Sequence, residues 1–165
     1  MQRLHSTLDA ARTARGLTWV ELAREINKPF EGTTSIPIHP STIRGMTTKR
    51  AVVGTVVLQV LRWLQRTPES FLTGRDAAST AEEALPEPGP GRVLRFDTRA
   101  LYAALDARRR EYGLTWKQLA AALPGFTESS LRNLSTGSAT GFPPVMTLTQ
   151  WLRRPAAQFV RDYSR

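Results

Sequence analysis

The strongest structural signal in this chain is the stretch "GLTWVELA", residues 16–23, because it returns almost unchanged as "GLTWKQLA" at residues 113–120. Six of the eight letters agree, and they include a tryptophan, which occurs only four times in the chain. A phrase repeated in this way indicates a duplicated structural unit. The rest of the chain therefore has to be compared with itself.

The duplication extends over both halves of the chain once one insertion is allowed. An offset of 97 residues aligns Trp19 with Trp116, and an offset of 88 residues aligns Ile43 with Leu131. The change of offset places an insertion of nine residues in the first half, within "NKPFEGTTSIPIHP", residues 27–40. The two copies therefore differ mainly in the turn that follows the repeated phrase.

A segment of different composition separates the two copies. The stretch "RDAASTAEEALPEPGPG", residues 75–91, is rich in Ala, Glu, Pro and Gly and lacks the apolar pattern of its flanks. The sequence therefore predicts a first domain at residues 1–74, a linker at 75–91 and a second domain at 92–165. The two domains carry net charges of +5 and +7, whereas the linker carries −3.

The overall composition points to a polyanionic partner. The chain of 165 residues has 23 Lys and Arg against 14 Asp and Glu, which gives a net charge of +9 and a pI near 11.1. Such an excess favours nucleic acid first and an anionic membrane surface second. The absence of cysteine excludes a disulfide framework, a thiolate zinc site and a cysteine nucleophile. The most apolar run, residues 51–61, is shorter than the roughly 20 residues that cross a bilayer, so we expect no membrane association.

Both halves are predicted to be helical, which gives an all-α fold. Leucines recur at helical spacing, and Thr18 and Thr115 each precede a short amphipathic run as N-caps. The valine-rich run after Gly54 could by itself be a strand. Its repeat partner "PPVMTLTQWL", residues 143–152, has prolines where a helix would begin, so we predict helices for both.

The order of these elements resembles the lambda-repressor-like helix-turn-helix family. Residues 114–137, "LTWKQLAAALPGFTESSLRNLSTG", follow the family pattern LTxxELAxxLGVSxSTIxxIExG with one extra residue at the turn. The resemblance implies two tandem helix-turn-helix domains of four to five helices each, joined by the Pro/Gly/Glu-rich linker. It also implies double-stranded DNA as the partner and a prokaryotic or phage transcriptional regulator as the function.

The family reads bases with its third helix, which enters the major groove. Carrying its base-facing positions over to the second half gives a second recognition surface: Thr127, Glu128, Ser129, Arg132 and Asn133. The five matching positions in the first half are His39, Pro40, Ser41, Arg44 and Gly45, of which His39, Ser41 and Arg44 form a first recognition surface. This first surface is poorer, because Pro40 and Gly45 offer no side-chain hydrogen bond. We therefore expect an asymmetric target site.

Contacts to the DNA backbone are expected from aromatic and basic residues around these helices. Trp19 and Trp116 occupy a position where the family often has a glutamine that touches a phosphate, and an indole N–H could do the same. The alternative is that each tryptophan packs against its own unit. The expected basic contacts are Arg12, Arg15, Lys49, Arg50, Arg108, Arg109, Arg110 and Lys117.

Two other interpretations compete with DNA binding. The insertion at residues 28–37 is either a local loop or a surface for a protein partner, so the chain could be an antitoxin or an adaptor. An enzyme is disfavoured. Two histidines and no cysteine offer little material for a metal site, and the chain has no Gly-rich phosphate loop. Asp9 and Asp106 are repeat-equivalent, which favours a helix-surface or capping role over paired catalytic carboxylates. We expect no cofactor and no metal.

The duplication also predicts how the chain assembles. Two tethered units would act as a covalent pseudo-dimer with a millimolar effective concentration and no need for a protein interface between them. The chain would then be a monomeric pseudo-dimer or would form a homodimer. A DNA-binding role predicts a cytoplasmic, nucleoid-associated protein.

Overall fold

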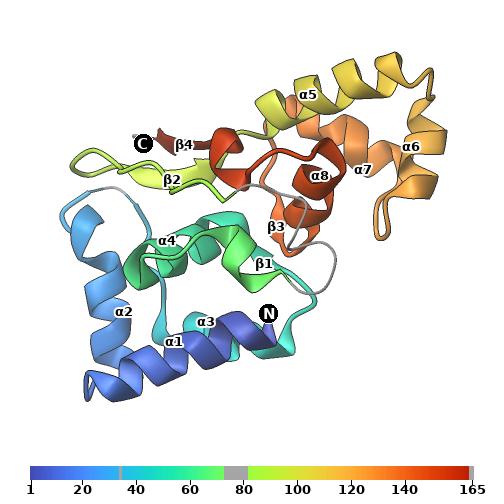
Figure 1. Cartoon of the computed structure of the whole chain (residues 1–165). Helices are drawn as coiled ribbons and strands as arrows, with labels where there is room; N and C mark the ends of the chain where they lie inside the picture. Colours follow the sequence, from blue (N-terminus) through green and yellow to red (C-terminus); the bar gives the residue numbers. More distant parts are fainter. Residues whose placement is uncertain (34, 73–81, 164–165) are drawn as a thin grey trace.

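The computed structural model describes residues 1–33, 35–72 and 82–163, which form a mostly helical molecule (Figure 1). Helix accounts for 60% and strand for 8% of the described residues. The all-α prediction is therefore right about the predominance of helix. It misses four short strands, which pair as two two-stranded sheets among the described residues.

The elements follow one another in a similar order in the two halves. Those of the first half are α1 (Gln2–Ala14), α2 (Trp19–Asn27), η1 (Lys28–Phe30), α3 (Pro40–Arg44), η2 (Gly45–Thr48), β1 (Val52–Val53), α4 (Gly54–Leu64) and η3 (Pro68–Phe71). Those of the second half are β2 (Val93–Phe96), α5 (Thr98–Glu111), α6 (Trp116–Ala122), α7 (Glu128–Asn133), η5 (Leu134–Thr136), β3 (Gly141–Phe142), α8 (Pro144–Leu152), η6 (Ala156–Phe159) and β4 (Val160–Tyr163).

The repeated phrase begins a helix in both halves. Thr18 caps α2 in a reciprocal capping box, in which the Thr18 backbone N–H donates to the Glu21 carboxylate at 2.7 Å. Thr115 caps α6 in the same way with Gln118. The two hydrogen bonds from Thr18 lower the pKa of Glu21; the bond from the Thr18 backbone has the larger effect, and the bond from its side chain has the smaller. The two predicted N-caps are confirmed.

The fourth helix of each half also agrees with its prediction. The valine-rich run is helical from Gly54 as α4, and residues 144–152 are helical as α8. Both helices end at a residue in the left-handed region, Gln65 with φ of 53° and Arg153 with φ of 52°. Positive φ is uncommon outside glycine, and these two residues lie 88 positions apart, so the aligned positions share an unusual conformation.

A pair of short strands joins the two halves. β1 pairs antiparallel with β3, with Val53 opposite Gly141 and Val52 opposite Phe142. The Gly54 N–H also donates to the Thr140 carbonyl at 2.9 Å. Val53 and Gly141 are 88 positions apart, so aligned positions face each other, as they do in an isologous interface. The halves therefore meet through hydrogen bonds, whereas the sequence suggested a tether without an interface.

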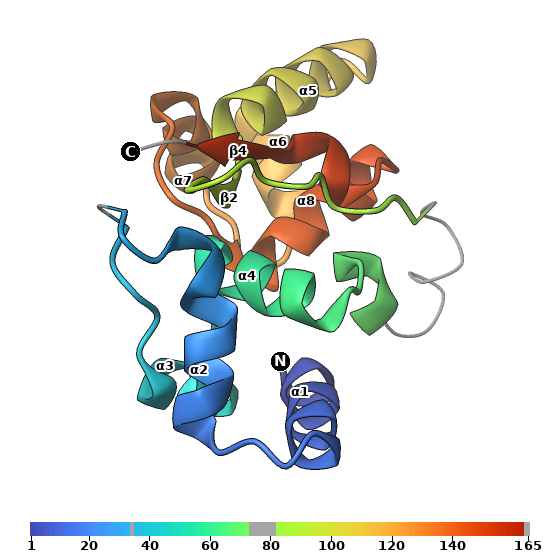
Figure 2. The ribbon, with the colours of Figure 1, turned by 90° about the vertical axis from the view of Figure 1, so that its left-hand side faces the viewer.

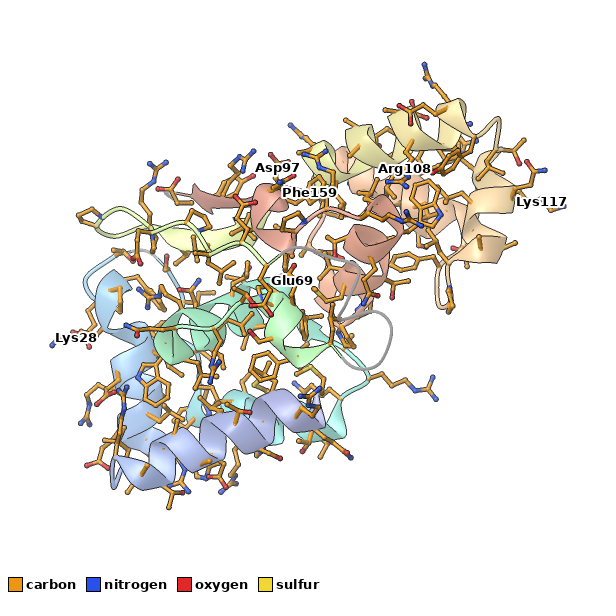
Figure 3. All side chains as sticks on the ribbon, in the orientation of Figure 1. Lys28, Glu69, Asp97, Arg108, Lys117 and Phe159 are labelled. Atoms are coloured by element: carbon orange, nitrogen blue, oxygen red, sulfur yellow. The ribbon has the colours of Figure 1, made fainter. Side chains whose placement is uncertain are left out.

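A second contact between the halves involves aligned 3-10 turns. η3 packs against η6, which begins 88 residues later. The Glu69 carboxylate accepts a hydrogen bond from the Ala156 N–H at 2.7 Å and is only 4% exposed. Glu69 lies near the centre of the molecule in Figure 3. Burial raises its pKa above the ordinary value, and the bond from Ala156 opposes that rise in part.

The hydrophobic core is continuous across both halves. Leu8, Ile43 and Leu58 belong to the same buried cluster as Leu105 and Leu131. β2 and β4 form an antiparallel ribbon that packs on α4 of the first half (Figure 1). The first half has no paired ribbon of this kind among its described residues.

The described part of the predicted linker lies along the folded chain. Glu82 accepts a hydrogen bond from Thr67 at 3.3 Å, and Glu83 accepts one from Gln158 at 3.2 Å. Leu85 packs against the core. The linker prediction for residues 75–81 lies outside the described residues, as do residues 73–74 of the first predicted domain and 164–165 of the second.

Candidate nucleic-acid interface

The third helix of each half is anchored by one buried side chain. Ile43 on α3 and Leu131 on α7 are both fully buried. α3 packs on α2, and α7 packs on α6. Because each helix is only five or six residues long, burying this side turns the neighbouring positions toward solvent. The predicted base-reading residues sit at those neighbouring positions.

The second recognition surface is mainly exposed and partly organised. Arg132 forms an ion pair with Glu128 at 2.9 Å, one helical turn earlier. Thr127 is the N-cap of α7, and its hydroxyl accepts from the Ser130 N–H at 3.1 Å. Ser129 and Asn133 are exposed. The structure therefore brings all five predicted residues to the start and outer face of α7, with the Thr127 hydroxyl already engaged.

The first recognition surface is exposed but offers fewer donors. His39 caps α3, and its Nδ1 accepts from the Ser41 N–H at 3.2 Å. The Ser41 hydroxyl lies 2.7 Å from the same nitrogen, so these two side chains satisfy each other. Arg44 is exposed. It remains the one long donor among the three predicted residues.

The two helices that carry the recognition surfaces, α3 and α7, lie toward the same side of the ribbon in Figure 2. In Figure 2, α3 lies at the lower left and α7 at the upper left, while residues 82–88 lie toward the right. The pairing of β1 with β3 holds the halves in this arrangement. Two exposed third helices on one side are what simultaneous engagement of one duplex requires.

The insertion separates α2 from α3 without loosening its own base. The Asn27 side chain donates to the Ile38 carbonyl and accepts from the Ile38 N–H, both at 2.9 Å. Phe30 within the insertion is buried, whereas Ile36 is 78% exposed. The described residues of the insertion, 28–33 and 35–37, are thus held at their base and present one large apolar side chain, that of Ile36, to solvent.

Trp19 and Trp116 each pack within their own half, which is the alternative given for them above, and they do so in matching stacks whose partners the sequence did not reveal. Trp19 stacks on His5 at 5.4 Å and carries the Arg12 guanidinium 4.7 Å from its ring centroid. Arg12 is held in turn by Asp9 at 2.6 Å and by the Leu17 carbonyl. The side chain of Arg12 is 20% exposed. This arrangement joins the first helix to the second.

The second half repeats this stack with Tyr102 in place of the histidine. Trp116 stacks on Tyr102 at 5.0 Å and carries Arg109 at 4.9 Å. Arg109 binds Asp106 at 2.6 Å and donates to the Leu114 carbonyl. The hydrogen bond from Arg109 is the main cause of a lowered Asp106 pKa. The repeat-equivalent aspartates, Asp9 and Asp106, were the available sequence signal.

The remaining predicted backbone contacts divide into engaged and open cations. Arg15 lies 4.4 Å above Trp63 and 3.6 Å from Glu25, and Arg110 pairs with Asp106 at 2.8 Å. Arg108 donates to the Leu152 carbonyl and points toward α8 (Figure 3). Among the predicted backbone contacts, the exposed cations that form no ion pair with another described residue are Lys49, Arg50 and Lys117.

The described residues hold no group of three or more His, Asp or Glu side chains placed to bind a metal ion. None of the helices they form is long and apolar enough to span a bilayer. Comparison of this chain with protein-family models, curated proteins and solved structures finds no match.

Proposed function

We propose that the chain is a sequence-specific double-stranded DNA-binding protein built from two lambda-repressor-like helix-turn-helix domains. The observation that carries the proposal is the pair of exposed third helices, α3 and α7, on one side of the molecule. Each is anchored by one buried residue at aligned positions. The family resemblance adds the expectation that these helices enter the major groove.

The proposed complex is that of a covalent pseudo-dimer. The aligned contacts of β1 with β3 and of η3 with η6 are those of a symmetric homodimer made within one chain. The role that fits this arrangement is a prokaryotic or phage transcriptional regulator, cytoplasmic and nucleoid-associated. Arg132 and Asn133 supply most of the base discrimination, because arginine pairs with guanine and asparagine pairs with adenine. Lys49, Arg50 and Lys117 contact phosphates.

Salt dependence of binding tests this proposal on a duplex of any sequence. The full chain is titrated onto a random-sequence 30-base-pair duplex at several salt concentrations. If six to ten phosphates are neutralised, affinity falls by roughly 10³ to 10⁵ between 50 and 200 mM salt. Lys117→Gln reduces the slope by about one ion, and Gln2→Ala on α1 serves as an exposed control. Binding without salt dependence, or no binding at 50 mM, contradicts the proposal.

The second candidate function is a protein-interaction module, an antitoxin or an adaptor. Its specific support is the insertion, which presents Ile36 at 78% exposure, together with the small number of donors on the first recognition surface. In that case a protein partner co-purifies in stoichiometric amount and its capture requires Ile36. Salt-sensitive DNA binding is then absent.

A further inference from the structure

The two third helices differ in what holds their arginines. Arg132 on α7 and Arg44 on α3 occupy aligned positions, 88 residues apart. Arg132 has a carboxylate and an aromatic ring as neighbours. Arg44 forms no ion pair with another described residue and lies over none of their aromatic rings. The same residue type is therefore held in one half and unheld in the other.

The first neighbour of Arg132 is the carboxylate of Glu128, one helical turn earlier. Its Oε1 accepts a hydrogen bond from the Arg132 Nε at 3.0 Å and lies 2.9 Å from Nη2. The two side chains are 56% and 43% exposed, and an ion pair of this kind is weak by itself. In the first half Pro40 stands at the position aligned with Glu128, so Arg44 has no such partner.

The second neighbour of Arg132 is Trp116 at the start of α6, the helix on which α7 packs (Figure 1). The Arg132 guanidinium carbon lies 6.0 Å from the centroid of the Trp116 ring, at the outer limit of a cation–π contact. The ring is itself fixed, because it stacks on Tyr102 and carries Arg109. It is only 6% exposed, which leaves it little surface to offer a phosphate. Trp116 is therefore a fixed surface beside Arg132.

The aligned tryptophan of the first half does not support Arg44. Trp19 stacks on His5 and carries Arg12, and Arg44 is not over its ring. The insertion lies between α2, which begins at Trp19, and α3, which ends at Arg44. The second half has a shorter turn at this place, and there the tryptophan and the arginine meet. Both supports of Arg132 are thus absent for Arg44.

The contact with Glu128 leaves one edge of the Arg132 guanidinium open. A guanidinium carries its N–H donors in a planar fork. Glu128 occupies the edge formed by Nε and Nη2, and Nη1 forms no hydrogen bond with another residue that the structure describes. The end of the fork, Nη1 together with the outer N–H of Nη2, is therefore available. This is the pair of donors that a bidentate contact with O6 and N7 of guanine uses.

Holding the side chain in advance strengthens such a contact. A long side chain loses rotamer freedom when it binds, and this loss weakens the interaction. Arg132 has lost part of that freedom before binding, because Glu128 and Trp116 restrict it. Arg44 would lose all of it on binding. The supports therefore favour base discrimination by Arg132 over discrimination by Arg44.

We propose that Trp116 is a positioning residue which, together with Glu128, holds Arg132 for bidentate recognition of a guanine. This inference rests on the proposed DNA-binding function and deepens it, since it assigns the base that α7 recognises and the residues that prepare its reader. Trp116 acts through Arg132 and contacts neither base nor phosphate. Glu128 orients the arginine and does not read a cytosine.

The restraint on Arg132 is tested first without DNA. The ¹⁵N relaxation of the arginine Nε–H groups of the full chain measures their mobility, and spectra of Arg132→Ala and Arg44→Ala assign the two signals. We expect an order parameter above about 0.6 for Arg132 and below that value for Arg44. In Trp116→Leu the Arg132 group should become as mobile as that of Arg44. Equal mobility of the two arginines in the wild-type chain overturns the proposal.

The effect on recognition is measured with the duplex that the intact chain selects. Each guanine of this duplex is replaced in turn by 7-deazaguanine, which lacks the N7 acceptor. The guanine that Arg132 reads is the one whose replacement weakens binding of the wild type but not of Arg132→Ala. At this guanine, Trp116→Leu should lower the discrimination by about two- to fivefold. In the Arg132→Ala background the same change should have no further effect, because Trp116 acts only through Arg132.

A conservative variant and a control separate positioning from loss of structure. Trp116→Phe keeps an aromatic ring and should retain more discrimination than Trp116→Leu. The control is Trp151→Leu, which removes another partly buried tryptophan of the second half, one that carries Arg108 rather than Arg132. It should leave the discrimination at this guanine unchanged. A thermal melt checks the fold of every variant.

A loss of discrimination in Trp116→Leu that persists in the Arg132→Ala background overturns the proposal, because the effect would then not pass through the arginine. If Trp116→Leu fails to fold, Trp116→Phe and the mobility of the two arginines in the wild-type chain provide the test. Failure to select any duplex contradicts the proposed function, and the guanine contact falls with it. The mobility measurement still decides whether Trp116 and Glu128 hold Arg132.

Discussion

The two halves of this chain share their buried positions and differ at their exposed ones. Ile43 and Leu131 anchor the third helices in the same way. The flanking position occupied by Asn133 in the second half is occupied by Gly45 in the first. The turn between the second and third helices spans residues 123–127 in the second half and 28–39 in the first. A common scaffold therefore presents two chemically different surfaces.

This difference teaches that a repeated scaffold need not carry the same exposed side chains in both copies. A symmetric pair of recognition surfaces reads two equal half-sites, whereas the pair in this chain offers unequal sets of donors. The contact between the halves keeps its symmetry, since Val53 faces its aligned residue Gly141. The contact between the halves thus keeps a dimer-like symmetry, while the exposed side chains of the two third helices differ.

The largest effect is expected where the two halves are most alike. Ile43→Ala and Leu131→Ala each remove a fully buried side chain, and each should lower the free energy of unfolding by about 2–5 kcal/mol. Because the core is continuous across the halves, both variants should unfold in a single transition. Urea denaturation followed by tryptophan fluorescence measures this. Two separate transitions, one of them unchanged, would show that the halves unfold independently.

The next effect concerns the recognition surfaces themselves. Arg132→Ala and Asn133→Ala should each cost about 1–3 kcal/mol of discrimination between target and non-target duplexes. Arg44→Ala should cost less, because the first surface provides fewer contacts to bases. Competition binding with the selected duplex and a scrambled duplex measures each loss. Equal losses for Arg44 and Arg132 would refute the asymmetry.

A smaller effect, on stability, is expected at a position where the aligned 3-10 turns differ. Glu69 of η3 aligns with Ala157 of η6, so only one of the two turns carries a carboxylate there. Burial raises the pKa of Glu69, so the native state binds a proton at this carboxyl more tightly than the unfolded state does. The stabilisation is present below the ordinary value of 4.5 and is lost as pH rises through the raised pKa. Glu69→Gln should remove this loss and be more stable than wild type by about 1 kcal/mol at neutral pH.

Unfolding free energies of both proteins across this pH range provide the measurement. Glu111→Gln, a change at an exposed position on α5, is the matched control and should follow the wild-type curve. A Glu69→Gln variant whose stability falls with rising pH as steeply as wild type would count against the buried-carboxylate account.

The smallest effect on DNA binding is expected at the insertion. Ile36→Ser removes an exposed apolar side chain that packs on little else, so it should change DNA affinity and stability very little. Anisotropy titration of the variant against wild type measures the first, and a thermal melt measures the second. A large loss of DNA affinity would place the insertion in the DNA interface, and loss of a co-purifying protein would support the interaction-module alternative.

Local sequence signals were enough to predict the helices of this molecule. The caps Thr18 and Thr115 follow from residue type and spacing alone, whereas the third helices, which Ile43 and Leu131 anchor, follow from the family resemblance. The alignment of the valine-rich run with residues 143–152 correctly favoured helix over strand. These features depend on neighbours close in sequence, which a repeated sequence pattern exposes directly.

The contacts between the halves could not be predicted in this way. β1 and β3 contain two residues each, which is too few to show a strand period, and their pairing depends on the approach of distant segments. The hydrogen bond from the Gln59 amide to the Leu94 carbonyl likewise arises from packing β2 of one half on α4 of the other.

The most direct test of the central claim is selection of duplexes from a randomised pool by the intact chain. The account predicts two half-sites about 34 Å apart on one face of the duplex, as for dimeric helix-turn-helix proteins. One half-site should be strongly specified and should relax when Arg132 or Asn133 is replaced by alanine. A perfect palindrome would contradict the unequal surfaces, and no enrichment of any sequence at low salt would contradict specific DNA binding altogether.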